Sequence, residues 1–132
     1  MPLITLKANK IFSENIRDSL AEGLSLITEK TLRKNKQVIV IHFETADQLG
    51  QWYVGGAVKN HDEAIFELSI LITQGTNTDA EKAEWIAQTW QLLTANLGNT
   101  PHPNYISIQE IDGKSWGYNG LSQAQRSIQS NK

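Results

Sequence analysis

The chain has 132 residues, 39% of them hydrophobic and 20% charged, which predicts a single globular domain over residues 1–132. A formal net charge of −2 gives no basic surface for phosphate backbones and argues against nucleic-acid binding. No apolar run approaches the roughly 18 residues that cross a bilayer, and the start lacks a secretion signal, so we expect a cytoplasmic protein without a membrane partner. With no cysteine and 3 histidines that lack His-x-His or His-x-x-x-His spacing, we expect no metal site and no cofactor.

The first half of the sequence predicts a strand, a helix and a second strand. Residues 3–8 form a short, largely apolar segment typical of an N-terminal strand. Ser13 is a suitable N-cap for a helix over 13–33, and its apolar residues recur at steps of three and four: Ile16, Leu20, Leu24 and Ile27. Residues 38–44 are β-branched and apolar, which predicts a strand buried on both faces. Residues 51–56 favour a short strand or hairpin arm ending in a glycine turn.

The second half predicts the same order of elements. Residues 65–73 alternate in polarity, as a half-buried strand does. Thr78 and Glu81 have the spacing of a capping box, and Gly98 is a suitable helix stop. The predicted core face of this helix comprises Ala83, Ile86, Trp90, Leu93 and Leu97. Residues 105–111 alternate again, and residues 112–120 are rich in turn formers.

The two halves match each other at a nearly constant offset. Corresponding residues lie 64 or 65 positions apart, namely Ser13 and Thr78, Trp52 and Trp116, and Gly56 and Gly120. This predicts a duplicated β-α-β unit, with one copy over 1–60 and the other over 61–132, each a right-handed crossover between parallel strands.

The expected fold is α+β in two layers, a four-stranded mixed sheet with two helices on one face. The apolar side chains on the other face need a partner, so we expect self-association. The tail after Asn119 is rich in Ser, Gln and Asn, and the sequence leaves open whether it covers a neighbouring subunit or frays.

Three segments give the sequence a resemblance to a known family. They are Met1-Pro2-Leu3-Ile4, the lysine-plus-strand segment 34–42, and a tail in which Tyr105-Ile106-Ser107 precedes Trp116-Gly117-Tyr118-Asn119. Over nearly its whole length the chain resembles the tautomerase superfamily, which includes 4-oxalocrotonate tautomerase and macrophage migration inhibitory factor. The resemblance implies a homotrimer with pockets at subunit interfaces, and a small enol or 2-oxo acid as substrate.

The resemblance implies that Pro2 is the catalytic base. Removal of Met1 before a small residue leaves a secondary amine at the start of the first strand. An α-amino group titrates near ~8, and burial in an apolar pocket penalises its protonated form. A neutral amine can take a proton from an enol or from the carbon beside a carbonyl and return it elsewhere. The structural alternative is an ordinary proline before a strand, where no ladder hydrogen bond is needed.

The resemblance also implies five substrate-binding residues, each with a simpler structural alternative. Lys34 matches a lysine that steadies a carboxylate, but it lies in a basic cluster that suits a helix end. Tyr105 matches a tyrosine donated across the interface, and Ser107 stands where relatives have Asn. Ile70 would supply a backbone group and an apolar wall, or simply core packing. Trp116 would form a pocket wall or a packing anchor.

The arginines limit the expected chemistry. Relatives of the 4-oxalocrotonate type use arginines where this chain has residues 10–12 and Ile39, and the chain contains only Arg17, Arg33 and Arg126. Bidentate binding of a dicarboxylate is therefore less expected than keto–enol exchange of a monocarboxylate such as an aryl pyruvate.

Two alternatives remain open at the level of sequence. A trimeric binding or interaction protein on the same fold would tolerate the missing arginines. A ferredoxin-like domain that senses amino acids or binds RNA has a related element order, although the negative charge and the absence of an aromatic RNA-binding signature argue against RNA.

Overall fold

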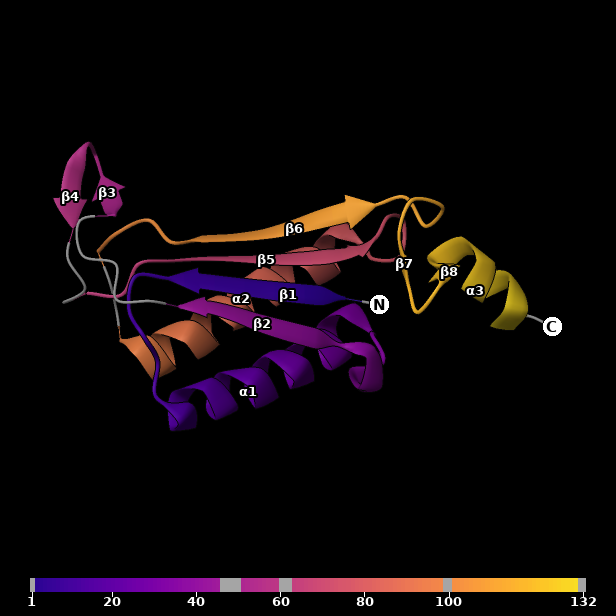
Figure 1. Cartoon of the computed structure of the whole chain (residues 1–132), viewed down its shortest axis with the longest axis horizontal. Coiled ribbons are helices and arrows are strands. Elements are labelled where there is room, and N and C mark those ends of the chain that lie inside the picture. Colours follow the sequence, from indigo (N-terminus) through magenta and orange to yellow (C-terminus); the bar gives the residue numbers. More distant parts are fainter. Residues whose placement is uncertain (1, 46–50, 60–62, 99–100, 131–132) are drawn as a thin grey trace.

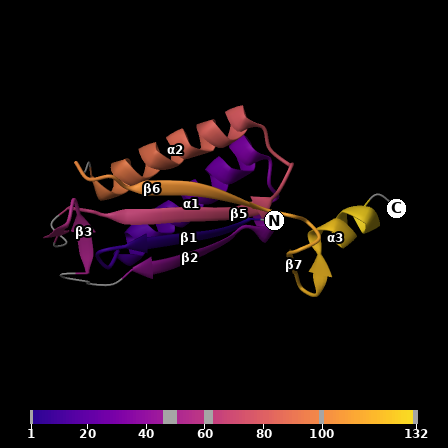
Figure 2. The same ribbon diagram turned by 90° about the horizontal axis from the view of Figure 1, so that it is seen from above.

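The computed structural model describes residues 2–45, 51–59, 63–98 and 101–130. Its centre is a four-stranded sheet in the order β2-β1-β5-β6, formed by β1 (Leu3–Ala8), β2 (Val40–Thr45), β5 (Phe66–Thr73) and β6 (Tyr105–Ile111). Two long helices, α1 (Glu14–Leu32) and α2 (Asp79–Leu97), lie side by side on one face of this sheet (Figures 1 and 2). The predicted fold class is confirmed.

The strand directions follow the repeated unit. β1 is parallel to β2 across α1, and β5 is parallel to β6 across α2, whereas the two central strands β1 and β5 are antiparallel. The start of β1 therefore lies at the same end of the sheet as the end of β5, where Leu3 pairs with Leu71. The predicted boundary between the units, at residues 60 and 61, lies outside the described residues.

Both long helices begin at the predicted caps. The Ser13 hydroxyl accepts a hydrogen bond from the Ile16 amide at the start of α1. Thr78 and Glu81 form a reciprocal capping box at the start of α2. α1 ends at Arg33, which adopts the left-handed conformation with φ of 57°, and α2 ends at Gly98.

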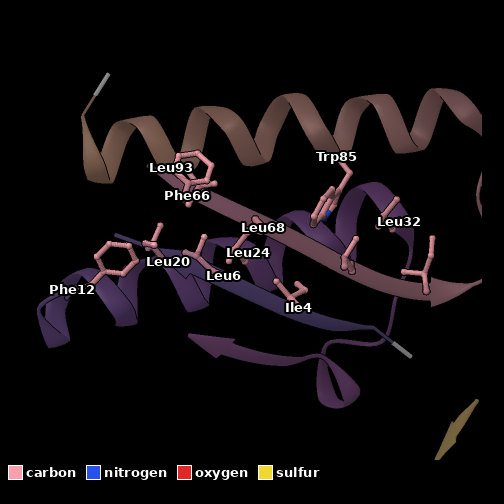
Figure 3. Close-up of a cluster of buried hydrophobic side chains, with 13 residues drawn as sticks. Ile4, Leu6, Phe12, Leu20, Leu24, Leu32, Phe66, Leu68, Trp85 and Leu93 are labelled. Atoms are coloured by element: carbon pink, nitrogen blue, oxygen red, sulfur yellow. The ribbon is translucent and has the colours of Figure 1, made fainter. Parts of the chain in front are cut away.

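The core lies between the sheet and the helices. Alternate residues of β1 and β5 point into it and meet leucines of α1 and α2, together with Trp85 (Figure 3). The predicted core face of α2 is wrong by part of a turn, because Trp85, Thr89 and Leu93 are buried while Ile86 and Trp90 are 38% and 37% exposed. Burial of the Trp85 indole, which finds a hydrogen-bond acceptor on α1, fixes this rotation.

The strand predicted over 38–44 is present, but its predicted start and its burial on both faces are wrong. Residues Lys36–Val38 form a 3₁₀ turn, capped by the Asn35 side chain, and β2 begins only at Val40. β2 is an edge strand with one open face, so its residues alternate in exposure and Val40 is 58% exposed. The β-branched residues of β2 suit a half-buried edge strand, and they do not indicate burial on both faces.

Two small hairpins project from opposite ends of the sheet (Figure 1). β3 (Trp52–Val54) and β4 (Ala57–Lys59) turn at Gly55-Gly56, and β7 (Gly117–Tyr118) and β8 (Leu121–Ser122) turn at Asn119-Gly120. All four turn residues have positive φ, as a two-residue hairpin of type I′ requires. The tail after β8 forms a further helix, α3 (Gln123–Ser130), whose start is capped by the Ser122 hydroxyl. None of the helices in the described ranges has the length and apolarity needed to cross a membrane.

Candidate functional site

Pro2 is buried at the beginning of β1 and lines a cavity of about 380 Å³. Its carbonyl accepts a hydrogen bond from the Val40 amide at 3.2 Å, which ties the start of β1 to the start of β2. The walls come from the strand starts, the turn before β2 and the β7–β8 hairpin: Pro2, Leu3, Gln37, Val38, Val40, Trp116, Gly117, Tyr118 and Asn119. None of these described lining residues is Lys, Arg, Asp or Glu, so they contribute no formal charge to the cavity.

Trp116 lines the cavity on the side of the β7–β8 hairpin. Its indole Nε1 donates to the Thr73 hydroxyl at 3.1 Å, which anchors it to the end of β5. Its carbonyl accepts from the Gln123 amide at 2.9 Å, which links the wall to the first turn of α3. The tail therefore helps to shape the cavity.

Tyr118 forms the neighbouring wall and is held by Arg126 of α3. The guanidinium carbon lies 3.9 Å from the centroid of the Tyr118 ring, a cation–π arrangement. One guanidinium nitrogen also donates to the Tyr118 carbonyl at 2.7 Å. This contact between the tail and the cavity wall could not be assigned from sequence spacing.

Lys34 lies near the same end of the sheet but does not line the cavity. It follows the left-handed Arg33, and its Nζ donates to the Thr76 hydroxyl at 2.8 Å in the loop after β5. Burial, and next the adjacent Arg33 guanidinium, lower the pKa of Lys34 below its ordinary value. Arg33 is itself paired with Glu81, with a nitrogen–oxygen distance of 2.7 Å.

The other predicted residues lie elsewhere in the chain. Ile70 is fully buried in the core and pairs with Ile4, away from the Pro2 cavity. Tyr105 and Ser107 begin β6 at the opposite end of the sheet and line a second cavity of about 510 Å³. Within one chain, the structure therefore brings Pro2 and Trp116 together but not Tyr105 or Ser107.

The sequence reasoning missed several lining residues. Gln37, Val38 and Val40 belong to a segment predicted to be one buried strand, and only the turn at Lys36–Val38 directs them to the cavity. Tyr118 and Asn119 lay within the family-like tail, and the Asn-Gly turn signal could have placed them on a hairpin. Among the described residues, no group of three or more His, Asp or Glu side chains could hold a metal ion.

Comparisons with solved structures support the fold. No protein-family model and no curated protein matches the sequence. A fused 4-OT, described as an asymmetric trimer, is 18% identical with a TM-score of 0.81, covering 96% of this chain and 98% of its own. Pt0534, inactivated by 2-oxo-3-pentynoate, is 14% identical with a TM-score of 0.81, covering 92% and 96%. A macrophage migration inhibitory factor-like protein from Entamoeba histolytica is 17% identical with a TM-score of 0.72, covering 92% and 97%. The chain thus has the fold of the tautomerase superfamily.

Proposed function

We propose that this chain, which has the tautomerase fold, is a tautomerase that uses the amine of Pro2 as its general base after removal of Met1. The observation that carries this proposal is the position of Pro2, buried at the start of a central strand and lining an uncharged cavity. An uncharged, largely apolar wall disfavours a protonated amine and so favours the form that accepts a proton.

The reaction is a proton transfer within one small enol or 2-oxo acid. The Pro2 nitrogen takes the enol hydroxyl proton, the carbon–oxygen bond becomes a carbonyl, and the electron pair of the carbon–carbon double bond moves to the adjacent carbon. The resulting ammonium returns a proton to that carbon, so the amine is regenerated and no cofactor is consumed. Trp116 and Tyr118 favour a substrate with an aromatic or apolar side chain, such as an aryl pyruvate.

The carboxylate of such a substrate needs polar partners, because none of the described lining residues is a Lys or Arg. Gln37 and Asn119 line the cavity and carry amide donors. The resemblance implies that Lys34 binds the substrate carboxylate. To do so, Lys34 would have to exchange its hydrogen bond to Thr76 for one to the substrate.

We also propose a homotrimer in which a neighbour contributes Tyr105 and Ser107 to the Pro2 cavity. The sheet face opposite the helices exposes Leu3, Val40 and Tyr105 by 37%, 58% and 72%, which leaves apolar surface for a partner. The fused 4-OT neighbours described as trimers support a trimeric assembly.

The decisive experiment combines intact mass with covalent labelling. The purified protein should lack Met1 and gain the mass of one 2-oxo-3-pentynoate molecule, because the Pro2 nitrogen adds to the electron-poor alkyne while a proton moves to the adjacent carbon. Labelling should abolish exchange of phenylpyruvate enol, and Pro2→Ala should be inactive but folded. Pro101→Ala, a proline substitution at an exposed position that lines neither cavity, is the matched control. A retained Met1, or full turnover by Pro2→Ala, would instead favour the non-catalytic interaction protein.

A further inference from the structure

The turn of the β7–β8 hairpin contains an asparagine that lines the Pro2 cavity. Asn119 is exposed, and Gly120 follows it at the tip of the hairpin. Of the asparagines in the sequence, only Asn119 is followed by a glycine. This dipeptide forms a two-residue turn, and it also places a side-chain amide next to the unhindered backbone nitrogen of a glycine.

The other copy of the repeat shows that the turn itself does not need an asparagine. Gly55 lies 64 positions before Asn119, and Gly56 lies 64 positions before Gly120. The φ angles are 59° and 79° in the first turn, and 51° and 89° in the second. The two hairpins therefore have the same kind of turn, and only the turn beside the Pro2 cavity carries a side-chain amide.

An asparagine followed by a glycine can cyclise without an enzyme. The Gly120 nitrogen attacks the side-chain carbonyl carbon of Asn119, a five-membered succinimide forms, and ammonia leaves. Water then opens the ring at one of its two carbonyls, which gives aspartate or isoaspartate at position 119. The approach is open at Gly120, because among the described residues beyond its chain neighbours no heavy atom lies within 4 Å of the place that a Cβ would occupy. Glycine also lets the backbone rotate freely enough for this attack.

We propose that Asn119 is a modification site, at which spontaneous deamidation places a carboxylate in the wall of the Pro2 cavity. None of the described lining residues is Lys or Arg, so the Pro2 amine is the only cation that the new carboxylate can meet among them. The effect on catalysis rests on the proposed function. A nearby carboxylate favours the protonated Pro2 amine, which cannot act as a base, and it repels the carboxylate of a 2-oxo acid.

The isoaspartate product changes the backbone as well as the charge. It brings the side-chain methylene into the main chain, so the connection between the paired residues Tyr118 and Leu121 becomes one carbon longer. A two-residue turn of this type tolerates no such insertion without a change in the strands that it joins. Deamidation should therefore displace Tyr118 from the cavity wall, and both products lower activity as the protein ages.

The first test measures the modification and needs no activity. Full-length protein is incubated for days at mildly alkaline pH and physiological temperature, and peptide mapping by mass spectrometry follows each asparagine. Asn119 should convert to aspartate and isoaspartate, while Asn15 and Asn35, which are exposed but not followed by glycine, should keep their amides. Equal conversion at those two positions would overturn the proposal. So would an unchanged Asn119 under conditions that convert a synthetic peptide of residues 115–124.

The second test measures the effect on Pro2. Asn119→Asp, which reproduces one product, should be labelled by 2-oxo-3-pentynoate about tenfold more slowly than the parent. Asn15→Asp adds the same charge in the first turn of α1, at the far end of the sheet, and should be labelled like the parent (Figure 1). Equal rates for Asn119→Asp and the parent, or equal slowing by both variants, would contradict a local effect on the cavity.

Asn119→Gly separates ageing from loss of the amide. It reproduces the Gly-Gly turn of the other hairpin and cannot form a succinimide, so its fresh and aged samples should be labelled at the same rate. The parent should lose labelling in proportion to the converted fraction, and an equal loss in aged Asn119→Gly would overturn the proposal. A fresh parent that is never labelled would refute the proposed function, whereas conversion of Asn119 is read from mass and is decided separately.

Discussion

The Trp85 indole of α2 donates a 3.0 Å hydrogen bond to the hydroxyl of Thr28 on α1, and both residues are fully buried. Each of these polar groups satisfies the other in the layer between the helices and the sheet. One turn further along α2, the Thr89 hydroxyl is also buried, but it has no hydrogen-bond partner among the described residues. Thr28 and Thr89 can therefore be compared directly, because both hydroxyls are buried but only that of Thr28 accepts a hydrogen bond from Trp85.

Thr28→Val should destabilise the fold by about 1–3 kcal/mol, because it leaves the buried Trp85 N–H without an acceptor. Thr89→Val should be neutral or stabilising, because it replaces an unpaired hydroxyl with a methyl group of similar size. Urea unfolding of the two variants measures both effects. Equal destabilisation would contradict the assigned role of the hydrogen bond.

The contribution of Glu81 to the free energy of unfolding should depend on pH. Its hydrogen bond with Arg33, followed by that from the Thr78 amide, lowers the pKa of Glu81 from 4.5 to about 2. A lowered folded-state pKa means that this stabilisation is complete above the unfolded value and is lost as pH falls through the folded one. Glu81→Gln, which keeps an acceptor for the Thr78 amide, should therefore be less stable than the parent near neutral pH. That difference should shrink between about pH 5 and pH 2.

The control for this experiment is Glu29→Gln on the exposed side of α1. It removes one carboxylate from a helix surface without removing the partner of Arg33, so its stability near neutral pH should lie close to that of the parent. A stability difference for Glu81→Gln that does not change with pH would show that the Arg33–Glu81 pair does not contribute through charge.

Gly117 allows a close approach that shapes the Pro2 cavity. A Cβ at this position would lie 1.9 Å from the Leu121 carbonyl oxygen, which belongs to the backbone of the paired strand and cannot move aside cheaply. Gly117→Ala should open the β7–β8 hairpin and displace Trp116 and Tyr118. We expect labelling by 2-oxo-3-pentynoate to slow roughly tenfold or more, with Ser115→Ala as the unaffected neighbour. Unchanged labelling of Gly117→Ala would exclude a role for this hairpin.

Substitution of Arg126 should weaken substrate binding and leave the chemical step nearly unchanged. Because it holds Tyr118 from behind the cavity wall, Arg126→Met should raise KM for phenylpyruvate enol about tenfold with little change in kcat. Arg126→Lys keeps the charge but not the planar fork, so its KM should lie in between. Arg17→Met, at the far end of α1, is the control. A fall in kcat alone would contradict this prediction.

The proposed trimer predicts complementation between inactive variants. Pro2→Ala and Tyr105→Ala should each have low activity, since every site would need Pro2 from one subunit and Tyr105 from the next. Co-expression of the two should restore about a quarter of the sites in randomly mixed trimers. Activity no higher than the sum of the separate variants would show that Tyr105 does not complete a neighbour's site.

The sequence was most informative where local chemistry decides the structure. The caps at Ser13 and Thr78, and the alternation along 65–73, predict their elements because each depends on residues a few positions apart. The fixed offset between the halves then yields the repeated β-α-β order.

Other features depend on distant partners and could not be predicted. The rotation of α2 follows from the bond between Trp85 and Thr28, which are 57 residues apart. The edge position of β2 follows from the sheet order, which its own residues do not encode. In the candidate site, the resemblance implies that Trp116 is a pocket wall or a packing anchor. The contact of Arg126 with Tyr118 depends on where α3 packs, which the sequence does not indicate.

The antiparallel pairing of β1 with β5 has a consequence for how this molecule can change. It places the β3–β4 hairpin of one copy at one end of the sheet and the β7–β8 hairpin of the other copy at the opposite end. Within one chain a whole strand length separates the two ends, but in the proposed trimer the Pro2 end of one subunit would meet the Tyr105 end of the next. The two copies of the repeat would then be constrained to evolve together, because a substitution at either end acts on the same composite site.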